Sequence, residues 1–92
     1  MTSPIFYEAP ASDFILLSFD GRVLEAFGYV NAVRYHLWEQ PRLEFRPGRS
    51  RRLAIVTKRG RRHTITYDAH LLPGLQALAA RLAESVSEVP EP

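Results

Sequence analysis

The chain is 92 residues long, too short to build two separate hydrophobic cores, so we expect a single domain over residues 1–92. Its hydrophobic content of 46% and aromatic content of 11% exclude an intrinsically disordered chain, and the absence of cysteine excludes disulfides and thiolate metal sites. The net charge is only +2, but nine of the twelve Lys and Arg residues fall within residues 42–62, where Glu44 is the one acid.

The beginning of the chain has no features of an export signal. Residues 1–20 contain neither a basic region nor a long apolar run. No apolar run anywhere in the sequence approaches the ~20 residues that a membrane span needs. We therefore expect a cytoplasmic protein with no membrane span, which agrees with the absence of cysteine.

Residues 1–12 have no clear hydrophobic period and include Pro4 and Pro10. Proline cannot donate a hydrogen bond to a strand ladder, so this segment is expected to be a loosely ordered arm. Within it, Ile5–Tyr7 is the segment that would add a short edge strand.

The next segments predict a hairpin. Phe14–Phe19 is an apolar run and Arg22–Phe27 is the returning strand, with Asp20-Gly21 between them. An Asp-Gly pair between two such runs is typical of a tight turn in which both residues have positive φ. Gly28–Asn31 predicts the turn that follows.

Strand periodicity continues as far as Tyr67, so antiparallel strands are expected across residues 13–67. Ala32–Trp38 alternates with a period of two, which a helix would not keep. Three further strands are predicted at Arg42–Arg46, Leu53–Thr57 and Arg62–Tyr67, separated by the turn dipeptides Pro47-Gly48 and Arg59-Gly60.

The period changes after Asp68, where one stripe of an amphipathic helix is formed by Leu71, Leu75, Leu78, Leu82 and Val86. Pro73 is favoured at the first helical position and disfavoured inside a helix, so the helix is predicted at residues 73–87, with a frayed tail at 88–92. The predicted fold class is α+β. It is a bent antiparallel sheet or partial barrel of six strands, or seven with Ile5–Tyr7, capped by one C-terminal helix.

This order of elements resembles that of the pleckstrin-homology-like domains, above all their short bacterial members. There, a segment like Trp38–Phe45 (W-E-Q-P-R-L-E-F) precedes a basic hairpin and a leucine-striped helix. The resemblance covers residues 13–87 and implies a bent sheet of seven strands, plugged at one end by the helix. The family binds phosphoinositides through basic residues in its first hairpin turn. Here that turn would be Asp20-Gly21, short and acidic, so the resemblance implies a scaffold that binds a protein or peptide.

Residue patterns for catalysis and metal binding are missing from the sequence. His36, His63 and His70 are spaced by 27 and 7 residues, which matches no metal-binding pattern. His63 shares a predicted strand face with Ile65 and Tyr67, where a position in the core or at its rim is expected. No G-x-S-x-G elbow and no glycine-rich phosphate loop occurs. We therefore predict a protein that is not an enzyme, with no catalytic, cofactor-binding or metal-binding residues.

The basic segment supplies the candidate binding residues, which are Arg46, Arg49, Arg51, Arg52, Lys58, Arg59, Arg61 and Arg62. Successive turns of a meander alternate between the two ends of a sheet. The turns around Arg49 and Arg59 are therefore expected at opposite ends of the Leu53–Thr57 strand, about 20 Å apart at ~3.3 Å per residue. The charges would then form a stripe rather than one cluster.

Two functions fit this stripe. The one we favour is a non-catalytic binding or adaptor module for a protein or peptide partner, with self-association through an unpaired strand edge. The alternative is a nucleic-acid-binding protein, in which arginines contact phosphates while Trp38 and Tyr67 stack on bases, and for which an oligonucleotide-binding barrel is the rival fold. A third interpretation is that the charges only keep a strand edge solvated.

Overall fold

A computed structural model of the chain describes residues 7–28, 31–46 and 51–87. These residues form seven strands and one long helix: β1 (Tyr7–Pro10), β2 (Leu16–Phe19), β3 (Val23–Phe27), β4 (Ala32–His36), β5 (Arg42–Arg46), β6 (Arg52–Val56), β7 (Arg62–Thr66) and α1 (Leu72–Ser87). Two short 3-10 helices, η1 (Leu37–Glu39) and η2 (Ala69–Leu71), precede β5 and α1. The fold class is α+β, as predicted.

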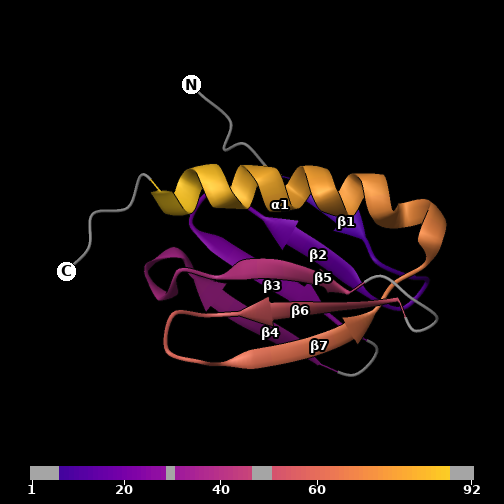
Figure 1. Ribbon diagram of the computed structural model, residues 1–92, viewed down its shortest axis with the longest axis horizontal. Helices are drawn as coiled ribbons and strands as arrows, with labels where there is room; N and C mark the ends of the chain where they lie inside the picture. Colours follow the sequence, from indigo (N-terminus) through magenta and orange to yellow (C-terminus); the bar gives the residue numbers. More distant parts are fainter. Residues whose placement is uncertain (1–6, 29–30, 47–50, 88–92) are drawn as a thin grey trace.

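The strands form two antiparallel sheets, so the prediction of one six-stranded sheet is wrong (Figure 1). β1–β4 form a four-stranded meander and β5–β7 a three-stranded one. The strand predicted at Ala32–Trp38 ends at His36, and η1 follows it from Leu37. The His36 N–H donates to Glu39 Oε2 at 2.9 Å, and Gln40 adopts a φ of 54°. This capped turn redirects the chain, so that β5 begins a new sheet.

The expected loose arm contains β1, so the prediction for residues 1–12 is wrong in part. β1 pairs with β2 from Tyr7↔Phe19 to Pro10↔Leu16. The Ala11 N–H donates to the Ile15 carbonyl, so Ala11 directs its backbone groups toward β2. Because backbone direction alternates along an antiparallel ladder, the nitrogen of Pro10 points away from β2. Proline is tolerated there, since an N–H at that position would not bond to β2. The strand suggested at Ile5–Tyr7 therefore overlaps β1 at Tyr7, while residues 5 and 6 lie outside the described residues.

Because β1 precedes β2, the first hairpin turn is formed by residues 11–15 and not by Asp20-Gly21. The Asp20-Gly21 turn also differs in type from the prediction. Gly21 has a φ of 96°, whereas Asp20 uses Oδ1 to accept the N–H groups of Arg22 and Val23, each at 2.8 Å. The aspartate side chain closes this turn, so a positive φ is needed at the glycine alone.

The hydrophobic core lies between the two sheets and α1. α1 begins one residue before the predicted position and ends at Ser87, as predicted. Its buried residues are Leu75, Leu78 and Leu82, which confirms the centre of the leucine stripe, and Val86 is partly buried. Leu71, the first residue of the predicted stripe, lies in η2. The helix packs over the edge strands β1 and β5 (Figure 1). Within the described ranges, no helix has the length and apolar character needed to cross a membrane.

Candidate functional site

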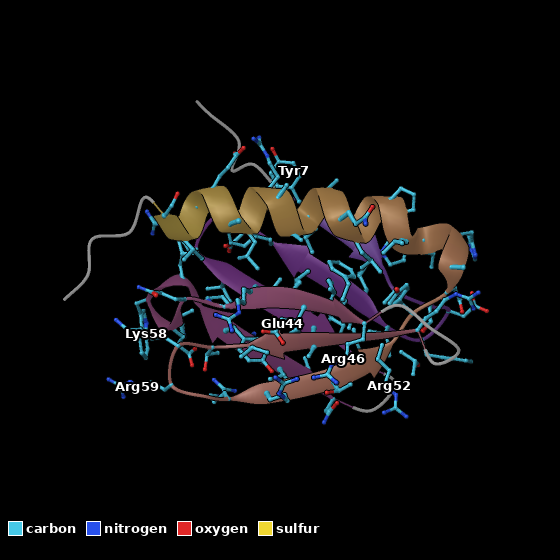
Figure 2. All side chains as sticks on the ribbon, viewed as in Figure 1. Tyr7, Glu44, Arg46, Arg52, Lys58 and Arg59 are labelled. Atoms are coloured by element: carbon cyan, nitrogen blue, oxygen red, sulfur yellow. The ribbon has the colours of Figure 1, made fainter. Side chains whose placement is uncertain are left out.

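The outer face of the β5–β7 sheet carries three of the predicted basic residues. The registers of the two strand pairs align side chains in three rows: Arg46, Arg52 and Thr66; Glu44, Ala54 and Thr64; Arg42, Val56 and Arg62. We call these nine residues the arginine face. Residues between them, such as Leu53, Ile55 and Ile65, point into the core, so the arginine face points to solvent. Figure 2 shows Glu44, Arg46 and Arg52 on this side of the sheet.

Charge is distributed unevenly on the arginine face. Glu44 Oε2 accepts hydrogen bonds from Arg42 Nη2 at 3.0 Å and Nε at 3.2 Å, and its Oε1 accepts a longer one from Arg62 Nη2 at 3.4 Å. The hydrogen bonds from Arg42 are the main reason that the pKa of Glu44 lies below its usual value. Arg46 and Arg52 lie opposite each other in register, and neither makes an ion pair within the described residues. The positive charge available to a partner is therefore concentrated on these two arginines.

A shallow hollow of about 280 Å³ lies on this face, and its lining residues are Arg46, Arg52, Ala54, Arg62 and Thr64. Ala54 forms the floor and is 2% exposed, although it points away from the core. The long side chains around it therefore cover the sheet. Guanidinium groups arranged around a small floor residue suit an oxyanion, because each guanidinium presents a fork of N–H donors.

Two of the other predicted basic residues lie away from Arg46 and Arg52. Lys58 and Arg59 lie in the β6–β7 turn, at the end of the sheet away from Arg46 and Arg52 (Figure 2). Arg51 is exposed just before β6, where its carbonyl accepts the Tyr67 N–H at 3.1 Å. Arg49 lies outside the described residues, and so does the predicted basic turn around it.

Arg61 has a structural role at the start of β7. Its Nη1 donates to Glu39 Oε1 at 2.7 Å, and its guanidinium lies over the ring of Tyr35 in β4. Burial would raise the pKa of Glu39, but hydrogen bonds from the His36 N–H and from Arg61 outweigh it, so the pKa lies below its usual value. Burial also raises the pKa of Tyr35, against the opposing charge of Arg61.

The predicted pair of stacking aromatics does not share a surface. Tyr67 is 7% exposed and packs edge-on against Phe45 in the core. Trp38 is 61% exposed, but it lies in η1 and stacks on His36, with a ring separation of 5.9 Å. The two rings that were expected to stack on bases are therefore on different parts of the molecule.

β7 is an edge strand of its sheet. The Thr57 N–H donates to the Arg61 carbonyl and the Tyr67 N–H to that of Arg51, which fixes the phase of the β6–β7 ladder. In an antiparallel ladder of this phase, His63 and Ile65 direct their backbone groups toward β6. The N–H and C=O groups of the residues at 62, 64 and 66 therefore point away from β6, toward the free edge.

An apolar cleft of about 730 Å³ borders this free edge. It is lined by Phe14, Ile15, Ala26, Gly28, Asn31, His63, Thr64, Ile65 and Thr66. Phe14 is 66% exposed, so its ring presents apolar surface beside the cleft. His63 is half-buried, as predicted, and its Nδ1 has no hydrogen-bond partner within the described residues. Sequence analysis missed this cleft, because the residues of its two walls lie far apart in the chain.

The described residues hold no group of three His, Cys, Asp or Glu side chains placed to bind a metal ion. No protein-family model matches the chain, and neither a curated protein nor a solved structure is similar enough to count as a match. The candidate site therefore consists of the β7 edge, the cleft and the arginine face.

Proposed function

We propose that this protein is a non-catalytic binding module that takes an extended peptide segment of a partner protein as an added strand on β7. The observation that carries the proposal is the outer edge of β7, which pairs with no strand in the part of the chain that the structure describes and which borders the apolar cleft. Added strands gain affinity from backbone hydrogen bonds and specificity from alternate side chains that enter pockets. The edge of β7 supplies the backbone hydrogen-bonding groups, and the cleft supplies the pocket for side chains.

The proposed scaffold is pleckstrin-homology-like, acting in the cytoplasm. Support for the scaffold comes from sheets of four and three strands followed by a C-terminal helix, since the family has seven strands and a helix at one end. The first hairpin turn, residues 11–15, contains Asp13 and no Lys or Arg. That composition favours a peptide over a phosphoinositide headgroup. The absence of cysteine supports a reducing compartment.

The proposal is tested by removing one edge donor. Thr64→Pro deletes an N–H that points to the free edge and leaves the β6–β7 ladder bonds in place, whereas Thr64→Val keeps the N–H. The probes are peptides of about twelve residues selected on the native protein from a displayed random library. We expect the selected peptides to bind the valine variant and to lose binding to the proline variant.

Amide chemical-shift mapping on the unmodified protein gives a second readout that does not depend on the proline variant folding. The selected peptides should perturb the amides of Thr64 and Thr66 and those of Phe14 and Ile15 across the cleft. Perturbation confined to α1 or to the Trp38 region would contradict strand addition on β7. Unchanged affinity for a folded Thr64→Pro variant would contradict it equally.

Nucleic-acid binding is the alternative function. The observation in its favour is the pair of arginines, Arg46 and Arg52, without an ion pair within the described residues. Without a shared aromatic surface, such binding would consist of phosphate contacts and would be strongly salt-dependent. A salt titration separates it from peptide binding.

A further inference from the structure

The apolar cleft and the arginine face meet along β7. Thr64 lines both the cleft and the hollow among the arginines. Along β7, the side chains of Arg62, Thr64 and Thr66 belong to the arginine face, whereas His63 and Ile65 face inward. A strand added beside β7 would continue this alternation, because residues paired across a ladder point to the same face of a sheet.

We propose that the peptide bound along β7 carries oxyanionic side chains, carboxylate or phosphoryl, at alternate positions that lie over the arginine face. Apolar side chains at the intervening positions occupy the cleft. This inference rests on the strand addition proposed above and adds the chemistry of the partner to it.

Two positions of an added strand come within reach of arginine. A residue beside Arg62 lies about 5 Å from it across the ladder. Among the described residues, the one ion pair of Arg62 is its 3.4 Å contact to Glu44, so a second carboxylate can compete for it. A residue beside Thr66 lies two strand spacings from Arg52, roughly 10 Å, which an extended arginine and an acidic side chain span together.

Charge complementarity also decides between a peptide and a second copy of this chain. Antiparallel pairing of two β7 edges around Thr64 would merge both arginine faces into one surface. Arg46, Arg52 and Arg62 would then be doubled on a continuous sheet face, with Arg62 of each copy opposite Thr66 and in one row with Arg52 and Arg46 of the other. Gathering like charge in this way opposes the association. An oxyanionic strand instead lies beside Arg62 and within reach of Arg52, which makes no ion pair within the described residues.

The test uses three acetylated and amidated peptides of about seven residues, in which valine alternates with glutamate, phosphoserine or serine. Serine is the neutral match of phosphoserine. At low salt we expect the glutamate or the phosphoserine peptide to bind at least about tenfold more tightly than the serine peptide, a difference of about 1.4 kcal/mol. The tighter of the two anionic peptides identifies the source of the oxyanion.

Charge-reversal variants locate the effect. In Arg52→Glu combined with Arg62→Glu, the preference for the anionic peptides should disappear. Arg59→Glu with Lys58→Glu makes the same change in net charge at the β6–β7 turn, away from the arginine face, and should keep the preference. Loss of the preference in both double variants would overturn the assignment to the arginine face.

Other outcomes separate this inference from the function it rests on. Equal affinities for the three peptides, all lost in Thr64→Pro, would overturn the inference and leave strand addition standing. Failure of every peptide, including library-selected ones, to perturb the β7 amides would overturn both. A dimer in sedimentation experiments that dissociates in Thr64→Pro would show that the occupant of the edge is a second copy, which also overturns the inference.

Discussion

The guanidinium carbon of Arg61 lies 4.7 Å from the centre of the Tyr35 ring, and this contact joins the two sheets across the side that α1 does not cover. The Lys58 N–H adds a hydrogen bond of 3.0 Å to the Glu39 carbonyl in the same region. The cleft residues Gly28 and Asn31 come from the opposite end of the β3–β4 hairpin. The sheets are therefore tied together at one end of β7 and leave the cleft at the other.

Arg61→Ala is expected to lower the free energy of unfolding by about 1 kcal/mol, because it removes an ion pair and a cation–π contact at a partly exposed site. Urea denaturation measures the change. Arg59→Ala, in the adjacent turn, is the matched control and should stay within about 0.5 kcal/mol of the unmodified protein. Equal effects of the two substitutions would show that Arg61 does not tie the sheets together.

Leu78→Ala is expected to lower the free energy of unfolding by about 2–5 kcal/mol, because Leu78 is 2% exposed in the middle of the leucine stripe. Gln76→Ala, on the exposed side of the same helix, should change it by less than about 0.5 kcal/mol. Chemical denaturation followed by tryptophan fluorescence compares the two. A loss below about 0.5 kcal/mol for Leu78→Ala would mean that α1 does not pack on the sheets.

The pH dependence of stability should contain a contribution from Glu39. Its pKa in the folded protein is lower than its ordinary value of 4.5, because the hydrogen bonds from His36 and Arg61 outweigh burial. A lowered pKa stabilises the folded state above the unfolded pKa, and this stabilisation is lost as the pH falls through the folded pKa. Glu39→Gln should therefore reduce stability at neutral pH and make the decline below the ordinary pKa less steep. Urea denaturation across this pH range measures the free energy of unfolding of both proteins. If it fell equally steeply with pH in the unmodified protein and in Glu39→Gln, the contribution assigned to Glu39 would be contradicted.

Strands in which apolar and polar residues alternate were predictable, because burial of one face of a strand imposes a period of two. The division into two sheets was not, since it depends on the Glu39 side chain that caps the His36 turn. β1 was obscured by Pro10, which is tolerated there because its nitrogen faces a free edge. The basic segment pointed to the arginine face, but the pairing of Arg46 with Arg52 follows from a register that composition does not reveal.

The cleft could not be predicted from the sequence, for a different reason. One wall comes from Phe14 and Ile15 in the first hairpin turn, and the other from the edge of β7. Sequence periodicity places Phe14 in a strand, whereas it lies exposed in the turn before β2. The packing of the two sheets brings these two segments together. A local sequence pattern cannot predict such a contact, because the segments lie far apart in the chain.

The nucleic-acid alternative predicts a steep salt dependence. Each phosphate neutralised would contribute a slope of about −0.9 on a duplex, or about −0.7 on a single strand, in log K against log salt. We expect no measurable binding to DNA or RNA at about 50 mM salt, because the exposed aromatic Trp38 and the arginine face lie apart. Tight binding with such a slope, abolished by Arg46→Glu and Arg52→Glu together, would favour the alternative.

The most direct test of strand addition on β7 is an N-methyl scan of a bound peptide, in which each backbone amide is methylated in turn and affinity is measured. An antiparallel strand added to β7 would direct every second N–H of the peptide toward the edge groups at positions 62, 64 and 66. Strand addition on β7 predicts loss of affinity at alternate positions across the bound segment, with little change at the positions between them. Losses at consecutive positions, or no loss at any position, would contradict it.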